Sequence, residues 1–513
     1  MSKNKKLFKS AGIVGGFTLF SRILGYVRDI VIARYFGTAT IAAQAFIVAF
    51  RIPNTLRHLV GEGAANAAVI PILSEYLGED KKKEFWHITN IMLNLIIIVL
   101  AIITIIGTIM APVIVRIIAF GFVNDPAKLE LTIYLTRIMF SFIFFIGIAA
   151  YGMGVLNTLR NFAIAAVGSC FLNITMIIFG IWVCQRFEQP VIGLAIAVLL
   201  GGLFQILVQI PVLLKKGFYF EFAFDFSHPA IKKMGRLLLP RMVGSSIYQL
   251  NAFLDTFFAS FSSIVGQGAI GALYFSNRLI QFPTALFGSA LATACLPTMS
   301  RQAIKNDIPG LKNTLAVALK TLLVFLIPST VGLLVLSRPI VSILFERGEF
   351  DQLSTQITSL ALMYYCFGIF FYSAARVITS CFYALKDTRT PVKVTFYCLL
   401  LNGVLNFLLM KPLQVGGIAL ATSISSAVNF FLLLYLLRQK IGIIGFGKVI
   451  KMFYAIIIAS SIMGAGCIYA YYYCRKLMAG WQALAIAVIS AMLIYLIVGW
   501  MLKIFKGFHV NLE

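Results

Sequence analysis

Long uncharged apolar runs recur along the whole chain, and they constrain its fold more than any other feature. Residues 88–115, for example, contain no charged side chain. A helix needs about 20 predominantly apolar residues to cross the hydrocarbon core of a bilayer. Apolar types make up 60% of the 513 residues and charged types only 12%, whereas soluble domains have roughly 45–50% and about 25%. We therefore predict an all-α polytopic membrane protein, and an ordinary soluble enzyme is excluded.

Polar breaks divide the apolar runs into about fourteen predicted transmembrane helices. These are expected at 8–33, 38–77, 86–119, 128–154, 161–184, 190–214, 231–262, 268–300, 312–345, 354–384, 391–410, 414–437, 449–474 and 480–502. An even number of spans places both ends of the chain on the same side of the membrane.

The distribution of basic residues predicts which side that is. Lys and Arg number 43 against 18 Asp and Glu, a formal charge of +25. Lys and Arg collect in cytoplasmic loops, and here they gather at the two ends and in alternate loops such as 81–83 and 215–216. Both termini are therefore predicted to be cytoplasmic. We interpret the excess of basic residues as a signal of membrane topology, and we expect no nucleic-acid partner.

A group of basic residues falls within or at the margins of the predicted helices. Its members are Arg22, Arg28, Arg51, Arg57, Arg116, Arg137, Arg241, Arg278, Lys320, Arg338 and Arg376. Several lie near helix ends, where a long side chain can reach the interface. Arg22, Arg28, Arg57 and Arg278 are harder to explain in this way, because each would cost roughly 2.5–3.5 kcal/mol near a helix centre. We expect these four to line a polar cavity.

Few carboxylates lie near these arginines. Asp29 and Glu62 occur within the first two predicted helices or their margins and Asp255 in the seventh, 231–262. A surplus of guanidinium groups suits a substrate with phosphate or carboxylate groups, because the planar fork binds such oxygens with two hydrogen bonds. The alternative is that the arginines only pair with carboxylates and carbonyl groups between helices.

Two arginine pairs have the same spacing of six residues. They are Arg22 with Arg28 and Arg51 with Arg57. Six residues place two side chains about 120° apart around a straight helix, so such a helix cannot direct both members of a pair inward. Gly25 interrupts the first pair and Pro53 the second, and kinks occur at such residues. The first two helices are therefore predicted to bend around the cavity.

An internal duplication is visible in the sequence. Leu156, Arg160 and Asn173 recur as Leu385, Arg389 and Asn402 at a constant offset of 229, and Pro53-x-x-Leu56 recurs as Pro283-x-x-Leu286. Chance matching of apolar sequence is the alternative. The repeat predicts an N-lobe at 1–220, a C-lobe at 221–440 and two additional helices at 441–513. Lobes related by an axis along the membrane normal bind substrate between them, and alternating access follows as a hypothesis.

Several motifs resemble those of one known family across essentially the whole chain. They are Ser21-Arg22-x-Leu24-Gly25-x-x-Arg28-Asp29, Ala49-Phe50-Arg51-Ile52-Pro53-Asn54-x-Leu56-Arg57 with Glu62-Gly63-Ala64, Asn277-Arg278-Leu279-x-x-Phe282-Pro283 and Thr390-Pro391-Val392-Lys393. The family is MurJ (MviN), the lipid II flippases of the multidrug and oligosaccharidyl-lipid exporter superfamily. The resemblance implies a transporter, not an enzyme. It implies export of undecaprenyl-pyrophosphate-disaccharide-pentapeptide from the inner to the outer leaflet of the bacterial cytoplasmic (inner) membrane, for peptidoglycan synthesis.

The resemblance also implies which residues bind the substrate. Arg22, Arg28, Arg57 and Arg278 match the family's cavity arginines, which are taken to engage the pyrophosphate and the acidic headgroup. Arg51, Asp29, Glu62 and Asn54 are the further candidates for substrate binding.

The two helices outside the repeat match a pair that borders a groove for the polyprenyl tail. Small residues such as Ala459 and Gly464 would leave room either for close helix approach or for a lipid chain.

Two departures from the family pattern concern coupling. Gln44 stands where relatives often carry an acid. Asp255, Asn402, Asn406 and Thr422 are the nearest matches to a sodium site of some relatives, but Asn406 replaces a carboxylate. Sodium prefers oxygen ligands, as hard cations do, and these four side chains offer oxygen atoms. We expect transport to be coupled to Na⁺ or to the membrane potential. The alternative is that these residues form ordinary hydrogen bonds between helices. No other cofactor is expected.

Other functions remain open at this stage. A membrane transferase acting on the same lipid would need clustered carboxylates for metal assistance, but no two Asp lie within two residues of each other. An exporter of drugs or of another polyprenyl-linked saccharide is the stronger alternative. A scaffold for cell-wall synthesis enzymes is a third, since the cytoplasmic loops could recruit them. The expected partners are lipid II, membrane lipids and such enzymes.

Overall fold

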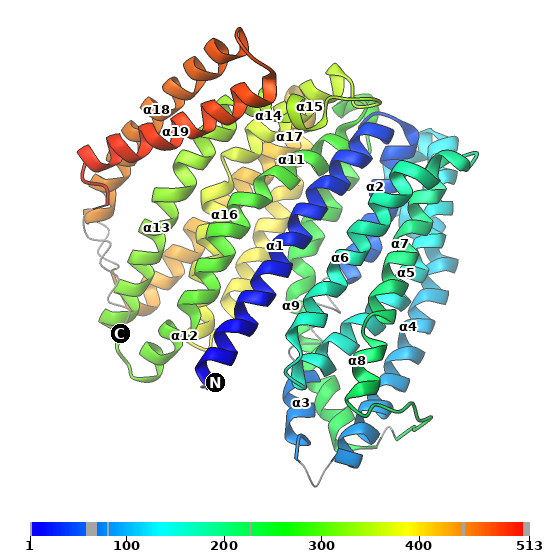
Figure 1. Cartoon of the computed structure of the whole chain (residues 1–513). Helices are drawn as coiled ribbons and strands as arrows, with labels where there is room; N and C mark the ends of the chain where they lie inside the picture. The colour runs from blue at the N-terminus through cyan, green and yellow to red at the C-terminus, as the bar shows by residue number, and fades with distance from the viewer. Residues whose placement is uncertain (1–2, 58–68, 79–81, 226, 444–446, 506–513) are drawn as a thin grey trace. The chain divides into compact units, whose positions relative to one another are not determined.

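The computed structural model describes residues 3–57, 69–78, 82–225, 227–443 and 447–505. Within these ranges the chain is almost entirely helical and contains no strand (Figure 1). The predicted all-α class is therefore confirmed. The chain divides into two compact units, 1–260 and 261–513.

The N-terminal unit is a bundle in which α5 is central, since α2, α4 and α7 all pack against it, while α1 packs against α6. Its α-helices are α1 (Lys3–Phe36), α2 (Ile41–Arg57), α3 (Ile70–Glu75), α4 (Lys82–Ile118), α5 (Pro126–Thr158), α6 (Phe162–Ile178), α7 (Pro190–Leu207), α8 (Ile210–Lys215) and α9 (Pro229–Ala259). Three short segments of other helical types are η3 (Phe120–Asn124), η4 (Phe179–Val183) and η5 (Cys184–Arg186).

The C-terminal unit has α16 and α17 packed together, with α12 and α13 against α16. Its α-helices are α10 (Ser262–Val265), α11 (Ala269–Pro283), α12 (Ala290–Ile304), α13 (Ile308–Val335), α14 (Ser337–Phe345), α15 (Gln352–Cys366), α16 (Ile369–Ala384), α17 (Arg389–Ile441), α18 (Gly447–Arg475) and α19 (Gly480–Met501). A π-helical segment, η6 (Thr284–Ser289), joins α11 to α12.

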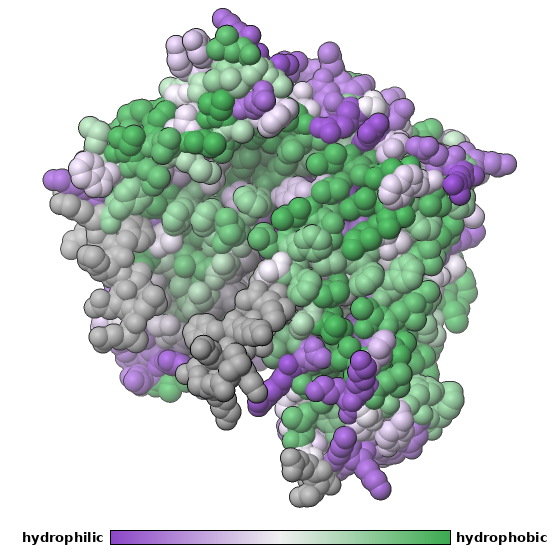
Figure 2. Space-filling model, in the orientation of Figure 1, coloured by the Kyte–Doolittle hydropathy of each residue, from purple (hydrophilic) through white to green (hydrophobic). Residues whose placement is uncertain are grey.

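Nine helices in the described part of the chain are long and apolar enough to cross a membrane, or ten if the bent pair α15 and α16 is one span. The helices α1, α2 and α9 are not among them. The lipid-facing character is plain on α4, where Ile105, Ile109 and Ile117 are each at least 60% exposed. Figure 2 shows apolar side chains spread over much of the visible surface in the same way. The chain is thus a multi-pass membrane protein.

Several predicted helices are interrupted where the sequence pattern showed a single apolar run. The predicted helix 312–345 is two helices, α13 and α14, separated at Leu336, and α15 bends by 45° into α16. Gln414 has a non-helical φ of 50° within α17, which separates the predicted helices 391–410 and 414–437. The break at Gln414 thus lies at a predicted boundary, whereas the bend between α15 and α16 lies at Phe367-Gly368 within an apolar run, where hydropathy gives no signal.

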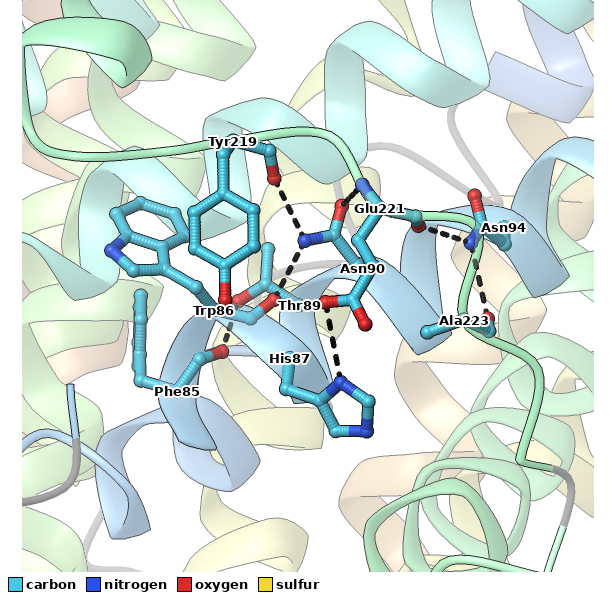
Figure 3. A network of polar contacts seen from close by, with 9 residues as sticks. All are labelled: Phe85, Trp86, His87, Thr89, Asn90, Asn94, Tyr219, Glu221 and Ala223. Atoms are coloured by element: carbon cyan, nitrogen blue, oxygen red, sulfur yellow. Dashed lines mark hydrogen bonds and ion pairs between the residues drawn. The ribbon is translucent and has the colours of Figure 1, made fainter. Parts of the chain in front are cut away.

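An extended segment follows α8 and is held against α4 by two asparagines (Figure 3). Asn90 Nδ2 donates to the carbonyl of Tyr219 at 2.9 Å, and its Oδ1 accepts the backbone N–H of Glu221 at 3.2 Å. Asn94, one turn later, donates to the carbonyls of Glu221 and Ala223 at 2.8 and 3.0 Å. The two asparagine side chains therefore provide hydrogen-bond partners for backbone groups of this extended segment, which no β-sheet provides.

Candidate substrate-binding arginines

Arg28 lies inside the packing of α1 against α6. Its side chain is 8% exposed and that of Asp29 is fully buried. Arg28 Nε and Nη2 donate to Asp29 Oδ1 at 3.0 and 2.7 Å, and Nη1 donates to Asn173 Oδ1 at 3.1 Å. Asn173 in turn donates to the carbonyl of Ser21 at 3.1 Å. The charge of Arg28 is therefore compensated within the N-terminal unit, and its guanidinium joins α6 to α1.

Arg22 has a different environment on the same helix. It is exposed, six residues before the buried Arg28. The spacing predicted that both arginines face one cavity, whereas here Arg28 is buried in the packing of α1 against α6 and Arg22 is exposed. The helix α1 is continuous through Gly25, which is buried. Of the two arginines, Arg22 is the one whose donors face away from the packing of the N-terminal unit.

Arg51 connects α2 to α9. Its Nη1 donates to the carbonyl of Ala252 at 2.7 Å and to Thr256 Oγ1, and the side chain is half-buried. Asn54, also half-buried, follows Pro53 in the last part of the same helix.

Arg57 is the final residue of α2, but its side chain lies outside the described part of the structure. Glu62 falls in 58–68, which also lies outside it. The predictions for these two residues therefore stand as they were made from the sequence.

Arg278 is the predicted arginine of the C-terminal unit. It is half-buried on α11, and its Nη1 donates to Gln281 Oε1 at 3.3 Å. Gln281 Nε2 donates to Asn277 Oδ1 at 2.7 Å. Both amides belong to the same helix and are neutral, and Gln281 orients the guanidinium.

The residues predicted for a sodium site are mostly buried. Asp255 lies on α9, and Asn402 and Asn406 lie one turn apart on α17, all below 9% exposure, while Thr422 is half-buried. Within the described ranges no group of three His, Cys, Asp or Glu residues is placed to hold a metal ion.

Gln44 makes a local contact where an acid was expected from the resemblance. It is buried on α2, and its Nε2 donates to the carbonyl of Ala39 at 3.0 Å. A carboxylate could not donate this hydrogen bond unless it were protonated.

The last two helices pack through their small residues. A Cβ on Gly464 would lie 2.8 Å from Val331 Cγ1 of α13, and one on Gly466 would lie 2.4 Å from Ile494 Cδ1 of α19. Ala459 is fully buried in the same cluster. Of the two alternatives for these residues, the structure has close helix approach. The outward faces of α18 and α19 are apolar, with Ile458, Leu493 and Leu496 more than half exposed.

A comparison with protein families decides which kind of bundle this is. The model of the family "Lipid II flippase MurJ" matches residues 32–501. The chain belongs to the MurJ family. A probable lipid II flippase MurJ of Vibrio cholerae is 35% identical over 84% of this chain and 82% of that relative. The lipid II flippase MurJ of Burkholderia cenocepacia is 32% identical over 85% and 84%.

Solved structures agree with this membership of the MurJ family. A lipid II flippase MurJ in an inward closed conformation matches 95% of this chain and 98% of its own, with a TM-score of 0.76 and 28% identity. An inward-facing multidrug resistance MATE transporter of the MOP superfamily covers 85% of this chain with a TM-score of 0.70 and 17% identity, which shows a shared fold alone. The resemblance identified from the motifs is confirmed.

Proposed function

We propose that this chain is a lipid II flippase, a transporter that moves the lipid-linked peptidoglycan precursor from the inner to the outer leaflet of the bacterial cytoplasmic membrane. The observation that carries the proposal is the match of the MurJ family model to residues 32–501. The arginines support it chemically, because guanidinium groups bind pyrophosphate and carboxylate oxygens with two parallel hydrogen bonds.

The proposed arrangement in the membrane has fourteen spans with both termini cytoplasmic. The sequence pattern supports it through the apolar runs and the basic loops. Transport then proceeds by alternating access of the two duplicated lobes, and the polyprenyl tail stays in contact with lipid while the headgroup crosses. The exposed apolar faces of α18 and α19 suit a surface along which such a tail lies.

Within this proposal the arginines have different roles. Arg22 and Arg278 bind the headgroup, with Arg57 as a third candidate. Arg28 and Arg51 mainly position helices, because Arg28 is paired with Asp29 and Arg51 donates to α9. The exposure of Arg22 and the neutral amide beside Arg278 favour the first group for contact with substrate.

The competing function is export of drugs or of a different polyprenyl-linked saccharide on the same fold. A cavity for cationic drugs would require acidic or apolar walls, and the helices here carry arginines. Coupling to Na⁺ through Asp255, Asn402, Asn406 and Thr422, or to the membrane potential, belongs to the proposal as its energy source. Recruitment of cell-wall enzymes would add partners without changing the transport step.

The experiment that tests the function uses purified full-length protein in liposomes. Fluorescent lipid II is placed in the inner leaflet, and its appearance outside is measured with an impermeant reagent. Vesicles with protein should export it, whereas vesicles without protein or with an Arg22→Ala and Arg278→Ala double variant should not. Export of lipid II at the rate of empty vesicles would contradict the proposal, provided that circular dichroism shows a folded protein.

A further inference from the structure

An arginine in α16 that the sequence grouped with helix-end residues has unusual surroundings. Arg376 is exposed and lies in the middle of α16. Its Nη2 donates to the hydroxyl of Tyr372 at 2.7 Å, and its guanidinium carbon lies 4.9 Å from the centroid of that ring. Its Nη1 donates to Ser289 Oγ on η6. Two neighbours from two elements therefore fix the guanidinium.

The depth of this group in the helices argues against a side chain that reaches for the interface. Ser289 lies near the middle of the candidate span Ala269–Ile304. If α15 and α16 form one bent span, Gln352–Ala384, Arg376 is nearer to the end of that span at Ala384, about 12 Å away along the axis. Its guanidinium nevertheless points back by one turn, towards Tyr372. An arginine that snorkels would point to the nearer end of the span.

The contacts of Arg376 leave its charge uncompensated. Tyr372 and Ser289 are neutral, and within the described residues no carboxylate lies at ion-pair distance from Arg376. A guanidinium has five N–H donors, of which these two contacts use two. Ionisable groups at membrane depth are costly, and they face a polar cavity or a partner rather than lipid. The remaining donors are available to an anion.

A glycine brings η6 close enough to α16 for the contact with Ser289. A Cβ on Gly288 would lie 2.6 Å from Ser373 Oγ and 2.7 Å from Ser373 Cβ, so only glycine permits this approach. The π-helical geometry of η6 directly follows Pro283, and such segments occur frequently at functional sites. The site is thus built by the backbone as well as by side chains.

We propose that Arg376, Tyr372 and Ser289 form a second oxyanion-binding site on the C-terminal unit. The inference rests on the proposed function. Arg278 lies about three turns before Ser289 on the same helical run, roughly 16 Å along the axis. That separation is too large for one pyrophosphate to bridge. The site therefore binds a carboxylate of the peptide portion of lipid II while Arg278 binds the pyrophosphate. The pyrophosphate oxygens are the other oxyanions of the same lipid that could occupy the site.

The test compares Arg376→Gln with the parent in the liposome export assay. Three lipids are used: lipid II, lipid II with its peptide carboxylates amidated, and the undecaprenyl-pyrophosphate disaccharide without peptide. Loss of a charged hydrogen bond predicts a fall of about tenfold or more for lipid II. Arg376→Lys should recover only part of the rate, because an ammonium lacks the fork. Tyr372→Phe should give an intermediate loss, because it removes the orienting hydroxyl and keeps the ring.

Arg338→Gln is the matched control, since Arg338 is an exposed arginine at the start of α14 in the same unit; it should export at the parental rate. A loss confined to lipid II supports the carboxylate as the ligand, and an equal loss for all three lipids supports the pyrophosphate. Parental export of all three by folded Arg376→Gln overturns the site and leaves the flippase function intact. Absence of export by the parent would instead count against the proposed function.

Discussion

At the scale of single residues, Arg28 shows how one of the predicted site arginines can also hold the fold together. Its ion pair with Asp29 is almost fully buried, and removing one partner of a buried pair typically costs about 3–5 kcal/mol. Arg28→Ala should therefore lower both thermal stability in detergent and export. Arg22→Ala should lower export alone, because Arg22 is exposed. Differential scanning fluorimetry and the liposome assay measure the two effects separately.

The double variant Arg28→Ala with Asp29→Asn controls this prediction. It removes both charges, so most of the stability should return while export stays low. An Arg28→Ala protein as stable as the parent would show that the buried pair does not stabilise α1 against α6.

The sequence identified Arg22 and Arg28 as cavity candidates but could not separate their roles, and it did not single out Arg376. The cost of a charge near a helix centre is the same for Arg22 and Arg28 when only the sequence is known. Their partners decide the difference, and these lie far along the chain: Asn173 for Arg28 and Ser289 for Arg376. Such contacts depend on how helices pack, which hydropathy does not record.

At the scale of elements, Asp387 secures the start of α17. Its carboxylate accepts the backbone N–H groups of Arg389 and Thr390 at 3.1 and 3.0 Å, the Thr390 hydroxyl at 2.6 Å, and Lys440 Nζ. Burial acts to raise the pKa of Asp387, but hydrogen bonds from Lys440 and Thr390 outweigh it and hold the pKa at about 2. The carboxylate form is therefore favoured by folding.

Asp387→Asn should lower the free energy of unfolding by about 2 kcal/mol at neutral pH, the equivalent of the pKa shift. Because the folded pKa is the lower one, this stabilisation is complete above the ordinary value of 3.8 and disappears as the pH falls to about 2. Denaturant titrations of parent and variant at several pH values measure it. A gap between the two proteins that is constant down to pH 2 would contradict the assignment.

The packing of α18 gives a second prediction at this scale. A leucine at Gly464 would collide with Val331 of α13, and overpacking typically costs about 1–3 kcal/mol. Gly464→Leu should therefore destabilise the C-terminal unit, and export of lipids with long and short polyprenyl chains should fall together. Ala465→Leu, at the exposed neighbouring position, is the control and should be stable. A selective defect for the long-chain lipid in stable Gly464→Leu protein would favour a tail groove at this position instead.

At the scale of the whole molecule, composition and hydropathy were sufficient to predict a helical membrane protein, but not to locate every bend and break in its helices. The apolar runs predicted the long helices of the described chain but not the short η3 and α10, and the duplicated motifs predicted two related halves. The break at Gln414 lies at the boundary predicted between 391–410 and 414–437, but the bend between α15 and α16 and the π-helical turn of η6 lie inside predicted helices. The bend and the π-helical turn arise from backbone geometry imposed by neighbouring helices, so a pattern of side-chain polarity cannot locate them.

The energy source of transport is also a property of the whole molecule. Asn402 and Asn406 are buried one turn apart on α17, and an asparagine offers a carbonyl oxygen but no charge. With Asp255 as the one acidic member of the proposed site, affinity for Na⁺ should be weak. Asn406→Asp adds a second carboxylate, so half-maximal export should require several-fold less Na⁺ in the variant than in the parent.

The measurement is the initial export rate of lipid II in liposomes as choline is replaced stepwise by Na⁺ at constant ionic strength, with K⁺ as a second control. Asp255→Asn should abolish the dependence on Na⁺, because it removes the one charge that a hard cation would bind. Ser426→Ala, a change one turn from Thr422 that removes only a hydrogen bond to the helix backbone, should leave the dependence as it is. Equal rates in Na⁺, K⁺ and choline for both the parent and Asn406→Asp would exclude sodium and leave the membrane potential as the energy source, which a valinomycin-clamped K⁺ gradient across the same vesicles would then reveal.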